Sequence, residues 1–491
     1  MKRISQATLS QMPASVARPI YDRDAARIGI VHLGLGAFHR AHQAVMTEAA
    51  LGAGDLDWGI AGVSLRSPET RDALGPQDGL YTVAVRDGTS ARLQVVGAIL
   101  RTLVAPEDPA AVLDLMAAPD TRIVSLTVTE KGYCHLPATG ELDESHPDIV
   151  HDLAHPERPR SAIGFLVEAI ARRRQAGLAP FTVLSCDNLP ANGRTLAKVV
   201  TRFAALRDPA LADYVAAHVA FPCSMVDRIV PATTEADRTF VAGMLGLNDA
   251  WPVMTEPFLQ WVIEDRFPEG RPDWGAAGAI FVTDVEPFEH MKLRLLNGSH
   301  STLAYLGYLA GHQTVADAMA APGFSELLDQ MMAQEVSPTL PPFEGFDLAA
   351  YRAALLARFR NPALHHRTWQ IAMDGSQKLP QRLLGTIRDR LKAGAGFERL
   401  AVGVAAWMVY ATGRDEAGAS IDVRDPLACR LAAATADKRN ATDLMDAYLG
   451  FQEVFGTDLP ASAPFRATLL RALDGLLANG AARTAQGFQH A

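Results

Sequence analysis

One short segment combines a lysine, an asparagine and a histidine at spacings that suit one side of a helix. It reads Glu289-His-Met-Lys292-Leu-Arg-Leu-Leu-Asn297-Gly-Ser-His300. At about 100° per residue, Asn297 lies about 140° and His300 about 80° from Lys292 around a helix axis, with leucines on the other side. Polar groups are costly to bury among leucines without partners. The segment is therefore either a functional site or a polar seam between packed elements.

These residue types suit the interconversion of a carbonyl and an alcohol. An alcohol that loses hydride must also lose its hydroxyl proton, and a lysine side chain whose pKa is lowered by burial can accept that proton. Asparagine amides can stabilise the developing alkoxide, and a histidine can orient a substrate hydroxyl. In this interpretation Lys292 is the acid/base, and Glu289, one turn earlier, either tunes it or passes its proton to solvent.

A second asparagine follows the apolar run FTVLSC (181–186), in Ser185-Cys-Asp187-Asn188-Leu-Pro190. If that run is a strand of a parallel sheet, Asn188 lies at the carboxyl edge, where doubly wound folds present ligands. The pair Asp-Asn before a proline is also ordinary turn chemistry. Its position alone makes Asn188 a candidate.

A glycine-containing turn follows the apolar run IGIVHL (28–33). Glycines between a first strand and its helix let the backbone turn tightly and approach a pyrophosphate at the helix N-terminus. The third glycine of the usual motif is replaced by His39, so a dinucleotide site and a plain structural turn both remain open. The candidates for cofactor contact in this turn are Gly34, Gly36, Ala37 and Phe38.

The second predicted strand lacks the acidic residue that binds the adenosine ribose in many NAD sites. After GVSL (62–65) the chain continues with Arg66-Ser67. An arginine at this position can meet a 2′-phosphate, so the residues alone leave NAD and NADP both open. Arg66 is therefore a further cofactor-binding candidate.

The elements that must position these residues follow from the apolar pattern. Continuous β-branched runs without alternation suit a parallel sheet covered on both faces, and helical patterns between them imply a doubly wound α/β sheet. The strand-like runs are 28–33, 58–65, 122–129, 181–186 and 278–285, and helical patterns include 161–177 and 194–206. The His/Pro-rich segment 146–160 is expected to be a surface loop. After about residue 286 helical spacing dominates, so we expect an α/β domain over 1–285 and a mainly α-helical domain over 286–491.

Composition excludes several classes of protein. The chain has 491 residues, too many for one small core. Its net charge of −9 argues against a dedicated nucleic-acid binder. The four cysteines, Cys134, Cys186, Cys223 and Cys429, form no CxxC pair, which makes a structural zinc site unexpected and suits a reducing compartment.

Targeting and membrane signals are weak. The first residues, MKRISQATLSQMPASV, contain no apolar h-region. The most membrane-like stretch, 400–413, has 14 uncharged residues, which predicts a buried helix and not a membrane span. We therefore expect a cytoplasmic protein without membrane association, either a monomer or a small homo-oligomer.

Competing chemistries lack their motifs. No tyrosine is followed four residues later by a lysine, and neither HExxH nor GxSxG occurs. His39 and His42 are close in sequence, but no carboxylate or cysteine set completes a zinc site. We expect a reaction without a metal.

Several ordered motifs together resemble the polyol-specific long-chain dehydrogenase/reductase family, which includes mannitol 2-dehydrogenase and fructuronate reductase. The motifs are IVHLGLGAFHRAHQ (30–43), SCDNLPANG (185–193), MVDRIVPAT (225–233), MKLRLLNGSHS (291–301) and MDGSQKLPQR (373–382). The resemblance implies an N-terminal Rossmann-like domain that binds NAD(H), a helical C-terminal domain, and lysine catalysis without zinc. It places the base on Lys292, the oxyanion asparagines on Asn188 and Asn297, and the proton-channel glutamate on Glu289. It places substrate contacts on His300, Asp227 and Lys378.

Two motifs look like the fructuronate reductase branch, namely EKGYC (130–134) and HRTWQIAMDGSQKLPQR (366–382). Mannitol dehydrogenases tend to carry an arginine where Gln370 stands here. Fructuronate differs from fructose by a distal carboxylate, for which Lys378, Arg382 and Arg367 are the candidate cations. We therefore expect reduction of D-fructuronate to D-mannonate. A mannitol or other polyol dehydrogenase is the alternative, and a sugar-acid sensor without turnover is a different class, against which the Lys292, Asn297 and His300 set argues.

Overall fold

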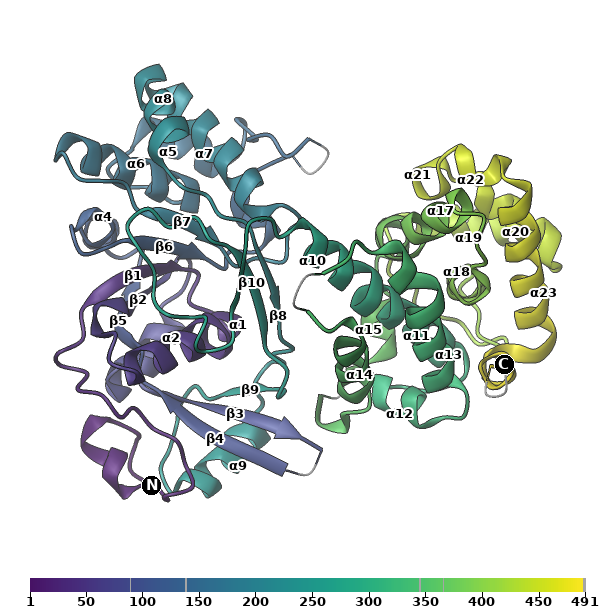
Figure 1. Ribbon diagram of the computed structural model, residues 1–491, viewed down its shortest axis with the longest axis horizontal. Coiled ribbons are helices and arrows are strands. Elements are labelled where there is room, and N and C mark those ends of the chain that lie inside the picture. Colours follow the sequence, from purple (N-terminus) through teal and green to yellow (C-terminus); the bar gives the residue numbers. More distant parts are fainter. Residues whose placement is uncertain (89, 137–138, 344–345, 365, 489–491) are drawn as a thin grey trace. The chain divides into compact units, whose positions relative to one another are not determined.

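The computed structural model describes residues 1–88, 90–136, 139–343, 346–364 and 366–488. The chain divides into two compact units, Met1–Glu286 and Pro287–Ala491 (Figure 1). The first unit contains the sheets and the second is built from helices.

A five-stranded sheet forms the centre of the first unit. Its strands, in order across the sheet, are β5 (Ile99–Val104), β2 (Gly59–Ser64), β1 (Ile28–Leu33), β6 (Ile123–Leu126) and β7 (Thr182–Ser185). Each neighbouring pair is parallel. The chain runs outward in one direction through β1, β2 and β5 and in the other through β6 and β7. The sheet is thus doubly wound, with its switch point between β1 and β6.

Helices cover both faces of this sheet (Figure 1). On one face lies α2 (Gln43–Gly52), packed against Ile30 and Ile60. The other face packs its buried valines and leucines against three helices. These are α4 (Pro109–Ala117), α6 (Ala162–Gln175) and α7 (Asn192–Arg207). Burial on both faces explains the continuous apolar runs and confirms the predicted Rossmann-like α/β fold.

Two small sheets complete the first unit. One has the order β4 (Ser90–Val96), β3 (Tyr81–Asp87), β9 (Val253–Thr255), and the other β11 (Ile280–Val282), β10 (Gln260–Glu264), β8 (Ser224–Asp227). The apolar run 278–285 therefore supplies β11, which pairs with β10 and not with the central sheet. Two more helices, α8 (Pro209–His218) and α9 (Glu235–Leu245), also belong to this unit.

The second unit is mainly α-helical, as expected. Its larger helices are α11 (Gly298–Leu309), α14 (Leu348–Phe359), α18 (Glu398–Ala411), α20 (Ala441–Leu449) and α23 (Ala463–Gln486). Residues 400–411 of the apolar stretch lie in the buried helix α18, and the last two residues follow its end. A Cβ added at Gly403 would lie 2.4 Å from Thr302 Oγ1, which shows how closely α18 approaches α11. Within the ranges described, no helix has the length and apolar character that a bilayer crossing requires.

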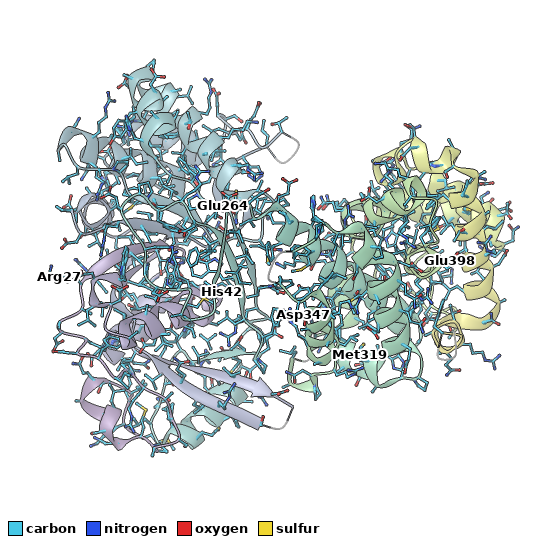
Figure 2. All side chains as sticks on the ribbon, in the orientation of Figure 1. Arg27, His42, Glu264, Met319, Asp347 and Glu398 are labelled. Atoms are coloured by element: carbon cyan, nitrogen blue, oxygen red, sulfur yellow. The ribbon has the colours of Figure 1, made fainter. Side chains whose placement is uncertain are left out.

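Two buried histidines stack beside the turn that follows β1. The ring centroids of His32 and His39 are 3.4 Å apart. His32 Nδ1 lies 2.8 Å from Ser125 Oγ, and its Nε2 lies 2.8 Å from Thr127 Oγ1. Burial lowers the pKa of His32 to about 3 and that of His39 well below its usual range. His42, labelled in Figure 2, is also buried and donates through Nε2 to the Gln260 carbonyl oxygen at 3.0 Å.

This burial makes stability sensitive to acid. Below pH 6.5 an unfolded chain protonates His32, whereas the folded chain holds it neutral down to pH of about 3. The contribution of neutral His32 to the free energy of unfolding is therefore fully present above about pH 6.5. It falls as the pH falls, and about 2 kcal/mol is lost at pH 5. We expect the Tm of the wild type to fall more steeply between pH 7.5 and 5 than the Tm of His32→Gln. His218→Gln, at an exposed histidine of α8, is the control and should keep the wild-type slope. Parallel plots of Tm against pH for His32→Gln and the wild type would contradict the assignment of this acid sensitivity to His32.

Candidate active site

A cavity of about 1200 Å³ opens at the carboxyl edge of the parallel sheet. It is lined by residues that follow four strands, namely Gly34–Gly36 after β1, Ser64–Ser67 at the end of β2, Ala105 and Pro106 after β5, and Thr127–Thr129 after β6. Most of the remaining wall comes from the connection between β6 and α6. The cavity spans the switch point of the sheet, which is where doubly wound folds bind their ligands.

The two glycines of the first turn differ in what they are needed for. Gly34 has φ +97°, and a Cβ added there would lie 2.2 Å from the Thr127 carbonyl oxygen. The fold itself therefore requires glycine at position 34. Gly36 is exposed, and the nearest atom to a Cβ added there is Gly34 O at 3.7 Å. The fold tolerates a side chain at 36, so the glycine suits the close approach of a ligand.

Alanine substitutions should separate these two requirements. We expect Gly34→Ala to lower stability by about 1–3 kcal/mol or more, because it combines left-handed φ with a backbone clash. We expect Gly36→Ala to change stability by less than about 0.5 kcal/mol and to raise the Kd for NADH about 10-fold or more. Thermal unfolding and fluorescence titration with NADH measure the two effects. Equal behaviour of the two variants in both assays would contradict this division.

The other cofactor candidates are placed differently. Arg66 is exposed and lines the cavity beside Ser67. Ala37 and Phe38 belong to α1 (Ala37–Ala41) and are not among the lining residues described; the Phe38 ring stacks on His42 with centroids 4.9 Å apart. The charged lining residues are the cations Arg66, Lys131, Arg158 and Arg160 and the acids Asp148 and Glu157. This lining suits an anionic ligand and is compatible with a dinucleotide with or without a 2′-phosphate.

The segment 146–160, expected to be a loop, contains the helix α5 (Pro147–Ala154). Proline occupies the first helical position, and the His146 ring nitrogen Nδ1 accepts a hydrogen bond from Asp148 N at 3.2 Å. Ile149 is buried in the core beneath. The loop interpretation was wrong for 147–154, where the His and Pro content concealed a helix with an N-cap and a buried face, whereas 155–160 forms no helix or strand.

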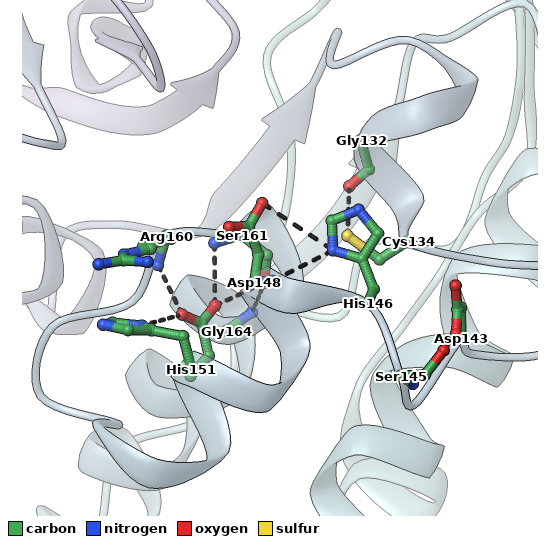
Figure 3. Close-up of polar contacts among 11 residues, drawn as sticks. Gly132, Cys134, Asp143, Ser145, His146, Asp148, His151, Arg160, Ser161 and Gly164 are labelled. Carbon is green, nitrogen blue, oxygen red and sulfur yellow. Dashed lines mark hydrogen bonds and ion pairs between the residues drawn. The ribbon is translucent and has the colours of Figure 1, made fainter.

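A buried carboxylate ties α5 to the next helix. Asp152 accepts hydrogen bonds from Arg160 N at 2.8 Å, Ser161 N at 2.9 Å and Ser161 Oγ at 2.7 Å. His151 Nδ1 lies 3.0 Å from the same carboxylate. Figure 3 labels these partners, His151, Arg160 and Ser161, which lie around this carboxylate at the start of α6. This wall of the cavity is therefore held by a defined network.

Asn188 and Asp227 both lie in the first unit, on connected elements. Asn188 is exposed shortly after β7, and Asp227 is the buried last residue of β8. Asn192 links their backbones: its Nδ2 donates to Asp187 O at 3.0 Å and to Ser224 O at 2.8 Å. The structure thus joins the turn that carries Asn188 to the strand that ends at Asp227.

Lys292 and Asn297 are the first and last residues of a π-helix. It lies between α10 (Glu286–Met291) and α11, and its wider turn is marked by a hydrogen bond from Gly298 N to Leu293 O. Residues five apart are then about one turn apart, so Asn297 lies closer to the direction of Lys292 than the α-helical estimate of about 140°. The regular α-helical geometry expected here was wrong. Lys292 is buried, Asn297 and Glu289 are half-buried, and π-turns of this kind are frequent at functional sites.

His300, on α11, lies among aromatic rings. Its ring centroid is 4.7 Å from that of His366 and 5.2 Å from that of Phe359, on which it stacks. Burial lowers the pKa of His300 well below its usual range, and the charges near it lower it further. These charges are His366, Arg382, Arg358 and Lys378. His300 is therefore neutral at physiological pH, able to donate through one ring nitrogen and accept through the other.

The predicted carboxylate-binding cations lie beside His300. Arg382 donates through Nη1 to Ser301 Oγ at 2.9 Å, and Lys378 donates through Nζ to the Met373 carbonyl oxygen at 2.6 Å. Burial lowers the pKa of both, and Arg382 lowers that of Lys378 further. The structure thus brings together His300, Lys378 and Arg382 within the second unit.

Sequence reasoning missed two neighbours of His300, Arg358 and His366. Arg358, on α14, and His366 both act on His300 electrostatically. Arg367, which we considered as a carboxylate ligand, is an exposed residue at the N-cap of α15 (Thr368–Ala372). Only packing joins α14 and the 366 region to α11, so no local spacing could have indicated these neighbours. Among the described residues, no group of three or more His, Cys, Asp or Glu side chains is arranged to hold a metal ion.

Comparisons with known proteins agree with this architecture. Residues 28–276 match the mannitol dehydrogenase Rossmann domain, and residues 284–477 match the mannitol dehydrogenase C-terminal domain. D-Mannonate oxidoreductase of Escherichia coli (strain K12) is 49% identical over 95% of this chain and 96% of its own length.

Two solved structures are similar over nearly the whole chain. Pseudomonas fluorescens mannitol 2-dehydrogenase, in a ternary complex with NAD and D-mannitol, is 42% identical with a TM-score of 0.82, covering 99% of both chains. A D-sorbitol dehydrogenase in substrate-free form is 33% identical with a TM-score of 0.91, covering 98% of this chain and 99% of its own. The sheet-edge cavity, the lysine-bearing π-helix and these matches agree with the predicted resemblance. The chain therefore belongs to the mannitol dehydrogenase family and is an oxidoreductase acting on CH–OH groups.

Proposed function

We propose that the protein uses NAD(H) to interconvert D-fructuronate and D-mannonate. The observation that carries this proposal is the pair of half-buried cations, Lys378 and Arg382, beside neutral His300. A substrate carboxylate gains charge-assisted hydrogen bonds from such groups, whereas an uncharged ketose does not. The name of the Escherichia coli relative, D-mannonate oxidoreductase, supports the same substrate.

The cavity of the first unit fits the cofactor in this proposal. Exposed Gly36 permits close approach of a pyrophosphate, and Arg66 and Lys131 supply positive charge. The Pseudomonas fluorescens relative, solved with NAD, supports NAD as the cofactor. When bound, the nicotinamide supplies or accepts the hydride.

Residues of this chain handle the proton and the oxygen. As the substrate ketone takes up hydride at carbon, Lys292 gives a proton to its oxygen, and in the reverse direction Lys292 removes that proton from the hydroxyl. The amides of Asn188 and Asn297 donate hydrogen bonds to the oxygen while it carries negative charge. His300 and Asp227 orient substrate hydroxyls, and Glu289 exchanges the proton of Lys292 with solvent.

The second candidate is a mannitol 2-dehydrogenase or a related polyol dehydrogenase. The Pseudomonas fluorescens relative, solved with D-mannitol, favours it. In that case Lys378 and Arg382 would bind hydroxyl groups or hold helices together.

Comparing D-fructuronate with D-fructose tests the proposal. Purified protein is assayed with each ketose and with NADH or NADPH, following the nicotinamide absorbance. We expect kcat/KM for D-fructuronate with NADH to exceed that for D-fructose by about 100-fold or more, the difference that one or two charge-assisted hydrogen bonds provide. A preference for D-fructose would move the protein to the polyol branch, and a preference for NADPH would overturn the cofactor assignment.

A further inference from the structure

Asp187, next to Asn188, holds two connections of the sheet together. Its carboxylate accepts hydrogen bonds from Val128 N at 3.1 Å, Thr129 N at 2.8 Å and the Tyr133 hydroxyl at 3.0 Å. These three donors belong to the connection after β6, whereas Asp187 itself follows β7. The carboxylate therefore bridges two neighbouring strand ends at the carboxyl edge of the sheet.

The segment held by Asp187 is part of the cofactor cavity. Val128 and Thr129 line that cavity, and Thr129 has φ +64°, a strained value for a residue with a side chain. Such a conformation costs about 1–3 kcal/mol and persists only where surrounding contacts fix it. The hydrogen bond from Thr129 N to Asp187 is such a contact. Tyr133, completely buried, also bonds Ser185 Oγ and anchors the segment to β7.

The other side of Asp187 is fixed as well. Its carbonyl oxygen accepts from Asn192 Nδ2 at 3.0 Å, and Ser224 N of β8 donates to Asn192 Oδ1 at 3.0 Å. The turn from 185 to 192 is thus pinned at both ends, and Asn188 lies within it. This network holds the backbone on both sides of Asn188.

We infer that Asp187 is a positioning residue, which fixes the Asn188 amide relative to the Val128–Thr129 wall of the cofactor cavity. The inference rests on the proposed function, in which Asn188 hydrogen-bonds the reacting oxygen. Asp187 itself touches neither substrate nor cofactor in this scheme. It acts through Asn188, because a shift of about 1 Å between a donor and its oxygen is enough to cost about 100-fold in rate.

A double-mutant cycle tests this inference. Hydride transfer is measured in the pre-steady state with saturating NADH and the better of D-fructuronate and D-fructose. We expect Asn188→Ala to slow it by about 100-fold or more and Asp187→Asn by about 10- to 100-fold. If Asp187 acts through Asn188, the double variant is no slower than Asn188→Ala within about 3-fold. If the double variant instead loses the product of the two single fold-losses in rate, the inference is overturned and the proposed function stands. An unchanged rate for Asn188→Ala would overturn the inference and the role proposed for Asn188, while the overall reaction would stand.

A matched buried carboxylate provides the control. Asp249, in the same unit, accepts from Thr82 N at 2.6 Å, Trp251 N at 2.9 Å and Gln77 Nε2 at 3.1 Å, and it is not among the residues that line the cavity. Asp249→Asn should lower Tm much as Asp187→Asn does, yet slow hydride transfer by less than about 3-fold. An equal loss of rate in both would make Asp187 merely structural.

A milder variant covers the case in which Asp187→Asn fails to fold. Tyr133→Phe removes one of the three donors to Asp187 and keeps both backbone donors. Because one hydrogen bond is lost, we expect Tyr133→Phe to slow hydride transfer by about 3- to 10-fold. In the Asn188→Ala background the same substitution should have no further effect on the rate. A loss of the same size in both backgrounds would contradict the inference.

Discussion

Replacing Lys292 by alanine should abolish turnover while leaving NADH binding nearly unchanged. A positioned acid/base accounts for about 100- to 10,000-fold of a rate, so kcat should fall by that factor. The cavity at the sheet edge, where we propose that NADH binds, is lined by residues of the first unit, whereas Lys292 belongs to the second. Steady-state kinetics on D-fructuronate and fluorescence titration with NADH measure the two quantities.

Lys392→Ala is the control for this prediction. Lys392 is an exposed lysine at the end of α17 (Gly385–Lys392), 3.8 Å from Asp389 in an ion pair, so its loss should leave kcat within about 2-fold. A Lys292→Ala protein that loses NADH affinity but keeps its kcat would refute the assigned role.

Replacing Lys378 by methionine should damage the reaction of D-fructuronate far more than that of D-fructose. Methionine keeps most of the side-chain length and removes the charge. A hydrogen bond to a charged group contributes about 1.5–3 kcal/mol, so kcat/KM for D-fructuronate should fall by about 10- to 150-fold. The value for D-fructose should change by less than about 3-fold, because this substrate carries no carboxylate.

The ratio of the two kcat/KM values is the decisive measurement for Lys378. Lys392→Met supplies the same chemical change at an exposed site and should leave the ratio unchanged. Equal losses on both substrates would remove Lys378 from carboxylate recognition. The carboxylate would then have to be bound by another group, of which Arg382 is the first candidate.

Local pattern was sufficient for four of the five strands of the central sheet, but it did not indicate β5 or the helix α5. Runs such as 28–33 and 181–186 are apolar without alternation because both faces of a central strand are buried, and the structure has β1 and β7 there. The helix α18 was equally predictable from the apolar stretch that begins at residue 400. The strand predicted over 122–129 is shorter in the structure. β6 ends at Leu126, after which Val128 N and Thr129 N donate to Asp187 on another connection.

The sequence by itself therefore determined the fold class, the family and the identity of the candidate residues, because these depend on side-chain type and on spacings within single segments. Only the tertiary structure decided which residues from distant segments meet. It turned Lys292–Asn297 into a π-helix, placed His366 against His300 and linked Asp187 to Thr129. The physical reason is that such contacts arise from the packing of helices and strand ends far apart in the chain, and periodicity within one segment carries no information about its neighbours in space.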